Sequence, residues 1–342
     1  MAEIVVHGSN MDSRVIIGED YLSLLKSLDK KKTFVFTDAN VYALYKGVME
    51  GFQVYVLPVG EDAKSFDIIQ KTLQFLLDKD ADRQSFILGF GGGVVCDIAG
   101  FTASVFMRGC RFGYIATTLL AQVDASVGGK NGINFSGYKN LVGTINQPEF
   151  VVCHPDFMKT LPKRELKCGL AEVLKIALVS DENLFSFLKN NRDKIFQLNA
   201  NILEKVIYEA IRLKSVVVNA DEKERGLRRI LNFGHTFGHA IESTSEYNHG
   251  EAVSVGMHIA LKISVDLGML DHKEFENITN LQKSYDLPID CAAKYSDLMR
   301  AVTRDKKRDS DSIHFVLIDR VGNAVTQRLS FEQLKAYEQI VC

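Results

Sequence analysis

The sequence lacks the features that mark membrane, secreted or nucleic-acid-binding proteins. No apolar run approaches the roughly 18 residues of a membrane-spanning helix. The opening residues, MAEIVVHGSN, show no basic segment followed by an apolar core, so we expect no signal peptide. The 41 basic and 43 acidic side chains give a net charge of −2, which argues against a general polyanion binder but leaves room for a local basic pocket. We therefore expect neither a membrane nor a nucleic acid among its partners.

Paired cysteines are also missing. The six cysteines lie at positions 96, 110, 153, 168, 291 and 342, and no two have Cys-x-x-Cys spacing. A chain of 342 residues does not need disulfides to stabilise its core. We interpret the cysteines as free thiols, most of them small core residues, in a reducing cytoplasm. Apolar residues make up 46% of the chain and charged residues 25%, which excludes disorder as the main state.

The length predicts about two domains, and the first part of the chain alternates short β-branched runs with helix-like stretches such as Ser65–Leu77. This alternation predicts an α/β domain with a parallel or mostly parallel sheet. The first two strands are close enough in sequence to form an antiparallel pair. The expected strands are Glu3–His7, Arg14–Ile17, Thr33–Thr37, Gln53–Pro58, Ser85–Leu88, Gly113–Ile115 and Phe150–Cys153.

After about residue 155 the pattern becomes mainly helical. We place the boundary near Pro162–Arg164, with an α/β domain at 1–163 and a helical domain at 164–342. Such a division favours a site in the cleft between the halves. Helical spacing is found in Leu161–Val179, Ile202–Val218, Leu227–Glu242, Glu251–Leu267 and Lys273–Tyr285, with a late strand at His314–Ile318 and a last helix at Phe331–Gln339.

Two glycine clusters stand out. Gly89–Asp97, with the sequence GFGGGVVCD, follows an expected strand and opens an expected helix. Free N–H groups at such a helix start can hold a phosphate group, such as a cofactor pyrophosphate. The run is not the usual Gly-x-Gly-x-x-Gly fingerprint, and a plain strand-to-helix turn is the alternative. For Gly128–Gly132, which contains Lys130, a solvated loop is the favoured interpretation.

The helical half carries a denser set of chemical groups. His235 and His239 are four apart, His249 follows ten residues later, and Glu172 and Lys175 share a face of an earlier expected helix. Three or four of these groups could hold a divalent metal with open coordination positions, which is typical of a catalytic site. Any one histidine alone is more readily explained as a core or surface residue.

Cationic residues surround these segments and could frame an anionic substrate, although each alone is more readily explained as a solvated charge. Arg228 and Asn232 are four apart, so on a helix they would share a face just before His235 and could together bind a carboxylate. The cations are Arg108, Lys130, Lys139, Lys175, Lys214, Arg228, Lys306 and Lys307.

The whole pattern resembles the 3-dehydroquinate synthase family. The matching segments are Gly91–Phe101, Arg108-Gly109, Thr117–Lys130, Lys139-Asn140, Thr160–Glu165, Ala171–Lys175, Leu231–Ala240, His249–Ala252 and Asp305–Lys307. The runs Gln122–Lys130 and Leu231–Ala240 are the most specific. Two departures are visible: Ala116 stands where the family usually has proline, and His154 where an aspartate is frequent.

The resemblance implies an N-terminal Rossmann-like nucleotide-binding domain and a C-terminal, mainly helical metal-binding domain, with the active site between them. It implies NAD and Zn²⁺ (or Co²⁺), with Glu172, His235 and His249 as metal ligands and His239 beside the phosphate instead. It gives catalytic roles to Glu224, His239, Lys175 and Asp124. It also implies a homodimer in which Arg108 reaches the partner's active site.

The resemblance extends to both binding sites. The implied NAD contacts are Asp38, Asn40, Glu61, Lys64, Gly91, Gly92, Gly93, Asp97, Thr117, Thr118, Lys139, Phe157 and Thr160. The implied substrate contacts are Arg108, Asp124, Lys130, Asn140, Lys175, Lys214, Arg228, Asn232, His239 and Lys306.

The implied reaction converts 3-deoxy-D-arabino-heptulosonate 7-phosphate into 3-dehydroquinate and phosphate, in the shikimate pathway of aromatic amino acid biosynthesis. It proceeds by transient oxidation with NAD, phosphate elimination, re-reduction and intramolecular aldol closure. The alternatives are another sugar phosphate cyclase, such as a 2-epi-5-epi-valiolone or amino-dehydroquinate synthase, and a metal-dependent alcohol or glycerol dehydrogenase. A non-catalytic binding protein on the same scaffold is a third.

Overall fold

The chain folds into two compact units. The computed structural model describes residues 2–18, 20–291, 293–304, 308–309 and 312–341. The first unit comprises the chain up to Leu161 together with 203–223, and the second comprises 162–202 and the chain from Glu224 onward. We expected one boundary between residues 163 and 164. Most of the segment 203–223 belongs to helix α7 (Ala200–Ala220). Asn219 and Lys214 of this helix bond to His7 and Asp124 of the first unit.

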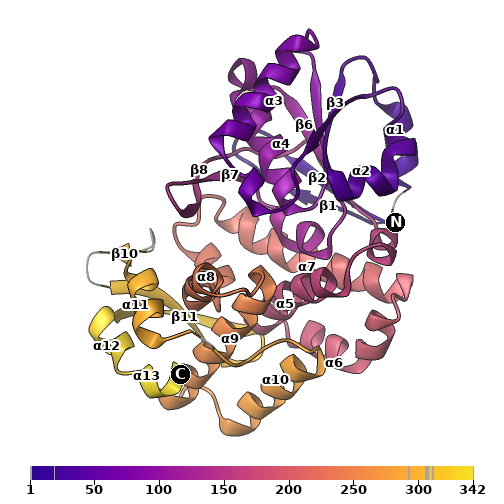
Figure 1. Cartoon of the computed structure of the whole chain (residues 1–342). Coiled ribbons are helices and arrows are strands. Elements are labelled where there is room, and N and C mark those ends of the chain that lie inside the picture. Colours follow the sequence, from indigo (N-terminus) through magenta and orange to yellow (C-terminus); the bar gives the residue numbers. More distant parts are fainter. Residues whose placement is uncertain (1, 19, 292, 305–307, 310–311, 342) are drawn as a thin grey trace. The chain divides into compact units, whose positions relative to one another are not determined.

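The first unit is built on a seven-stranded sheet in the order β1-β2-β9-β6-β5-β3-β4. Figure 1 labels β1, β2, β3 and β6 of this sheet. Only the β1–β2 pair is antiparallel, as expected, and the other neighbours are parallel. The strands are β1 (Ala2–Val6), β2 (Ser13–Ile17), β3 (Thr33–Asp38), β4 (Gln53–Leu57), β5 (Phe86–Gly91), β6 (Arg111–Ala116) and β9 (Phe150–Cys153). The inner strands β5 and β3 are almost wholly buried, as parallel strands covered on both faces are.

Helices α1 (Tyr21–Ser27), α2 (Ala39–Tyr45), α3 (Phe66–Asp78) and α4 (Gly93–Val105) connect these strands. Helix α4 is apolar almost all round and buries eight residues, which suits a helix enclosed within the unit. A separate hairpin, β7 (Lys130–Phe135) and β8 (Tyr138–Ile145), packs on α4. Our sequence analysis did not predict this hairpin.

The second unit is mainly helical, as expected. Its helices are α5 (Lys163–Ser180), α6 (Glu182–Phe196), α8 (His235–Thr244), α9 (His249–Asp266), α10 (His272–Ser284), α11 (Tyr295–Arg304), α12 (Phe331–Lys335) and α13 (Glu338–Val341). Helices α5 and α9 each bury thirteen residues and form its centre. No helix in the described part of the chain is long and apolar enough to span a membrane.

Three expectations for this unit were wrong in detail. The helix expected over Leu227–Glu242 is two elements, a 3-10 helix η6 (Leu227–Asn232) and α8, because Gly234 adopts a left-handed conformation between them. The last helix is likewise divided into α12 and α13. The late strand extends to β11 (Ser312–Arg320) and pairs with β10 (Arg308–Asp309) and with β12 (Asn323–Ser330) in an antiparallel sheet.

Candidate active site

In the first unit, most of the proposed NAD contacts lie where strands of the sheet end. Asp38 ends β3, Gly91 ends β5, and Thr117 follows β6. These three strands are neighbours in the order β6-β5-β3. The carboxyl edge of a parallel sheet is where α/β proteins bind nucleotides, so the topology brings these positions together at a suitable edge.

The glycine run forms the turn from β5 into α4. Gly92 is the N-cap of α4 and provides no side-chain cap, so the first N–H groups of this helix remain available to an anion. A Cβ atom on Gly91 would lie only 2.5 Å from Val95 Cγ2. The turn therefore needs glycine for steric reasons and leaves helix N–H groups uncapped, and phosphate binding at this run stays a prediction.

A buried charge cluster lies beside this turn. Lys64 Nζ is 2.5 Å from Asp97 Oδ2 and also contacts Glu61 and the Asn140 side chain. Burial raises the pKa of Asp97 to about 6, although Lys64 lowers it. Burial alone would lower the pKa of Lys64, but Asp97 and Glu61 raise it. The cluster thus keeps Lys64 protonated within a largely buried site.

Other proposed NAD contacts have more varied surroundings. Asp38 Oδ1 caps α2 by accepting from the N–H groups of Asn40 and Val41. The hydroxyl of Thr117 is buried without a hydrogen-bond partner. Thr160 bonds to Tyr45 Oη at 2.8 Å. Phe157 is buried against aromatic rings, Thr118 Oγ1 accepts from Ala121 N–H, and Lys139 is exposed on β8.

Two proposed substrate contacts of the first unit form an ion pair. Lys214 Nζ lies 2.6 Å from both the carboxylate and the carbonyl oxygen of Asp124, which belongs to a π-helical turn (Ala121–Ala125). Lys214 is 5% exposed. The nearby Gly128–Gly132 segment is not the solvated loop that we favoured, because Gly128, Gly129 and Gly132 are buried and Lys130 begins β7.

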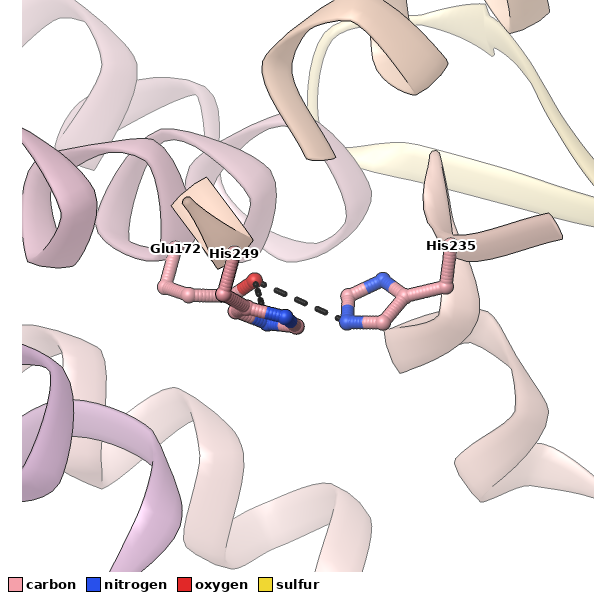
Figure 2. Close-up of side chains that lie close together, drawn as sticks. All are labelled: Glu172, His235 and His249. Atoms are coloured by element: carbon pink, nitrogen blue, oxygen red, sulfur yellow. Dashed lines mark ion pairs between the residues drawn. The ribbon is translucent and has the colours of Figure 1, made fainter. Parts of the chain in front are cut away.

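In the second unit, Glu172, His235 and His249 converge, with one ligand atom of each within 4.8 Å of the others (Figure 2). Glu172 Oε1 is 3.6 Å from His235 Nε2 and 3.4 Å from His249 Nε2. Ligand atoms around a tetrahedral zinc ion, at bonds of about 2 Å, lie roughly 3.3 Å apart. His239 is not in this group of described residues; its ring centroid is 5.2 Å from that of His235.

Both imidazoles have a partner for the second nitrogen. His235 Nδ1 is 3.1 Å from the carbonyl oxygen of Phe233, and His249 Nδ1 is 3.4 Å from Glu242 Oε2. Each Nε2 therefore faces Glu172. Hydrogen-bond partners of the other ring nitrogen, here Phe233 and Glu242, orient metal-binding histidines. Our sequence analysis missed Glu242, which lies seven residues after His235, about two turns along α8.

The electrostatics of the cluster balance one carboxylate against several cations. Burial alone would raise the pKa of Glu172, but Lys175 and His249 lower it to about 2. Burial alone would lower the pKa of His249, but Glu172 and Glu242 raise it to about 10. Lys175 is 2% exposed and contacts Glu172 directly. Glu172 is therefore held as a carboxylate, the form in which it can coordinate a cation.

Close packing of α5 against α9 sets the distance between Glu172 and His249. A Cβ on Gly250 would lie 2.5 Å from Cys168 Cα, so only glycine allows this approach. The N–H of Gly250 donates to Cys168 Sγ at 3.1 Å, and Arg164 of α5 donates two hydrogen bonds to Glu251. Asn248 and Glu251 form a capping box that begins α9 at His249.

Three more proposed residues of this unit, Glu224, Arg228 and Asn232, lie on or just before η6. Arg228 is buried, and Asn232 donates a short hydrogen bond to Glu224, whose backbone is in the left-handed region at φ 55°. The expected common helix face of Arg228 and Asn232 was wrong, because residues four apart in a 3-10 helix are about a third of a turn out of line. Lys306 lies outside the described residues.

Comparison with known proteins is decisive about the family. The 3-dehydroquinate synthase N-terminal model matches residues 54–168, and the C-terminal model matches residues 169–308. The chain is 40% identical to a 3-dehydroquinate synthase of Dictyoglomus thermophilum over 94% of this chain and 93% of that protein. It is also 40% identical to one of Thermodesulfovibrio yellowstonii, over 97% and 95% of the two chains.

The chain belongs to the 3-dehydroquinate synthase family.

Solved structures agree with this membership. A 2-epi-5-epi-valiolone synthase from Streptomyces hygroscopicus subsp. jinggangensis, solved with NAD⁺ and Zn²⁺, matches with a TM-score of 0.87 and 27% identity over 96% of each chain. A 2-deoxy-scyllo-inosose synthase matches with a TM-score of 0.84 at 22% identity, over 98% of this chain and 99% of that one, and a probable glycerol dehydrogenase from Sinorhizobium meliloti with 0.60 at 17%, over 85% and 89%. The last two show the shared fold alone.

The two departures from the 3-dehydroquinate synthase pattern fit local geometry. Ala116 is the buried last residue of β6. His154 is the N-cap of a 3-10 helix (Pro155–Lys159), and its Nδ1 accepts from the N–H of Asp156 at 3.2 Å. An aspartate at a cap accepts from the backbone in the same way, so the imidazole replaces that function.

Proposed function

We propose that this member of the 3-dehydroquinate synthase family catalyses the conversion of 3-deoxy-D-arabino-heptulosonate 7-phosphate into 3-dehydroquinate and phosphate. The observation that carries the proposal is the convergence of Glu172, His235 and His249 in a chain that is 40% identical, over nearly its whole length, to proteins named for that activity.

The donor set fits a divalent metal. It combines one buried carboxylate with two imidazole Nε2 atoms, and both Glu172 oxygens are buried without a well-directed hydrogen bond. Three protein ligands of this kind leave positions for a substrate oxygen. NAD and Zn²⁺ or Co²⁺, when bound, would supply a hydride acceptor and a Lewis acid that acidifies the C5 hydroxyl of the sugar.

The NAD contacts proposed in the first unit are supported by their position at the carboxyl edge of the sheet. The N–H groups at the start of α4 would bind the pyrophosphate. The second oxygen of Asp38 would accept from ribose hydroxyls, since Oδ1 already caps α2. The same negative charge would repel a 2′-phosphate, so we expect NAD rather than NADP.

The chain's own residues would then bind the substrate and move its protons. His239 would hold a proton near the phosphate group, and Glu224, positioned by Asn232, would act as acid or base. Asp124 and Lys175 would complete the catalytic set. Arg228 would bind the substrate carboxylate through parallel N–H bonds. The other proposed substrate contacts are Arg108, Lys130, Asn140, Lys214, Asn232 and Lys306.

We also propose a homodimer in which Arg108 reaches the partner's active site. Arg108 is exposed and lies between Met107 and Gly109, and all three residues have positive φ. Such a conformation is uncommon outside glycine and persists where it serves a purpose. The same unit also exposes apolar side chains, which suits a protein contact. They include Val105 and Met107 beside Arg108, and Leu141 and Ile145 on β8.

The activity can be tested with the heptulosonate phosphate and a catalytic amount of NAD, by measuring phosphate and NADH. We expect phosphate and dehydroquinate without accumulated NADH. Stoichiometric NADH would instead indicate a dehydrogenase, and no turnover would overturn the proposal.

The likeness to a valiolone synthase structure makes that activity the second candidate. Its substrate, sedoheptulose 7-phosphate, lacks the carboxylate. A buried arginine left without its partner costs about 2–5 kcal/mol, so we expect kcat/KM to be much lower for this sugar. Equal kcat/KM values would reject the dehydroquinate assignment.

A further inference from the structure

The backbone that carries His249 is fixed without any contribution from its ring. Asn248 caps α9, Glu251 completes the capping box, Arg164 ties Glu251 to α5, and Gly250 is pressed against Cys168. These contacts fix the backbone position from which the His249 side chain extends. They leave its rotation about the Cβ–Cγ bond open, and a half-turn would exchange its two nitrogens with ring carbons.

Glu242 supplies the missing constraint. Its side chain is 12% exposed, and its Oε2 lies 3.4 Å from His249 Nδ1, on the side of the ring away from Glu172. An Nδ1–H that donates to this carboxylate leaves a lone pair on Nε2, which is the atom that faces Glu172 and His235. A negatively charged acceptor also strengthens an imidazole as a metal ligand.

Among the described residues, Glu242 does not belong to the group of convergent ligand atoms, so it does not duplicate Glu172. The other histidine of the group is oriented by a backbone carbonyl, that of Phe233. His249 follows the α8–α9 connection and has a side chain as its acceptor. This ligand is therefore the one whose orientation a single substitution can release.

We propose that Glu242 is a positioning residue that orients His249 for metal binding and raises the metal affinity of the site. The inference rests on the metal site proposed above. It assigns Glu242 no contact with the metal or the substrate.

The test is to measure the Zn²⁺ affinity of the full-length protein by competition with a chromogenic chelator, for the wild type, Glu242→Gln and Glu242→Ala. We expect Glu242→Ala to weaken the affinity about 10- to 100-fold, the usual cost of losing an outer partner. Glu242→Gln keeps a neutral acceptor of the same shape and should lie between the two. Glu246→Gln is the matched control, because Glu246 is exposed and only three residues from His249; it should bind zinc like the wild type.

A spectroscopic readout separates orientation from folding. The visible absorption bands of the Co²⁺-loaded protein report ligand geometry, and we expect them to change in Glu242→Ala while circular dichroism stays that of the wild type. Zinc affinities of both Glu242 variants within twofold of the wild type would overturn the inference and leave the metal site standing. A wild-type protein that binds no zinc would overturn the metal site itself.

Discussion

His235 and His239 lie four residues apart on α8, and the spacing alone allows both to be ligands. The structure brings Nε2 of His235 toward Glu172, while His239 lies outside the group of convergent atoms in the described chain. We therefore expect His239→Ala to keep its metal and to lose about 10²–10⁴-fold in turnover if His239 moves protons. His235→Ala should lose metal and turnover together. Elemental analysis beside kinetics checks this, and metal lost in proportion to activity in His239→Ala would show that the wrong histidine was chosen.

A different histidine, His258, makes the stability of the fold depend on pH. His258 of α9 is 5% exposed, and its Nδ1 has no hydrogen-bond partner. Burial lowers its pKa to about 4, as do Lys262 and Lys283, while Asp290 and Gln282 act in the opposite direction. Because the unfolded chain binds this proton more readily, the stability from neutral His258 is present above pH 6.5 and is lost as the pH falls toward 4.

The size of this pH effect on stability follows from the pKa of His258, about 4 in the folded protein and about 6.5 in the unfolded chain. Between pH 8 and pH 5 the wild type should lose about 2 kcal/mol of unfolding free energy through this group, and His258→Gln should be spared that part of the loss. Urea unfolding at both pH values measures it, with His272→Gln as control because His272 is exposed. An identical pH dependence in the wild type and His258→Gln would refute this account.

Residue types and spacing were enough to mark Glu172 and the three histidines His235, His239 and His249 as candidate metal ligands, because such ligands are few and chemically distinctive. Only the family resemblance set His239 aside. Residue types and spacing were not enough to find Glu242, because an outer partner is defined by the direction of a ring nitrogen, which no spacing rule contains. The backbone carbonyl of Phe233 could not have been predicted for the same reason. Lys64 and Asp97 are 33 residues apart, and only the family resemblance marked them.

At the scale of elements, the contact between α5 and α9 depends on Gly250. We expect Gly250→Ala to destabilise the fold by about 1–3 kcal/mol through overpacking, since its Cβ would meet the Cys168 backbone. It should also weaken zinc binding by displacing His249. Gly47→Ala is the control, because a Cβ there meets nothing within 4 Å. Thermal melting and zinc titration of both variants check the prediction, which fails if Gly250→Ala melts like the control.

Helical periodicity predicted α3, α5, α7, α9 and α10 to within a few residues, since each has a continuous apolar stripe. It failed between Leu227 and Glu242, where the apolar spacing continues but the backbone turns at Gly234. A Cβ on Gly234 would approach Met257 of α9, so packing against another helix, absent from any local pattern, decides the break. The β7–β8 hairpin was missed because its glycines and charges resemble a loop.

For the whole molecule, alternating strands and helices were sufficient to predict a mostly parallel sheet, because chain direction and right-handed crossovers restrict the topology. The positions proposed for NAD came from the family resemblance. The sequence did not predict that residues 203–223 belong to the first unit. Their place there depends on pairs such as Lys214 with Asp124, 90 residues apart, whose partners nothing local identifies.

The proposed homodimer can be tested by mixing two inactive variants. If Arg108 completes the partner's site, Arg108→Ala and His239→Ala are each nearly inactive alone, yet they complement each other in a mixed dimer. The site with an intact His239 then receives Arg108 from the other subunit, while the second site lacks both groups. Random one-to-one assembly makes half of the dimers mixed, each with one working site, so activity should recover to about a quarter of the wild-type value.

Co-refolding the two variants and assaying phosphate release measures this recovery. Analytical ultracentrifugation establishes that dimers have formed. Mixed dimers without recovered activity would show that Arg108 serves its own subunit or none.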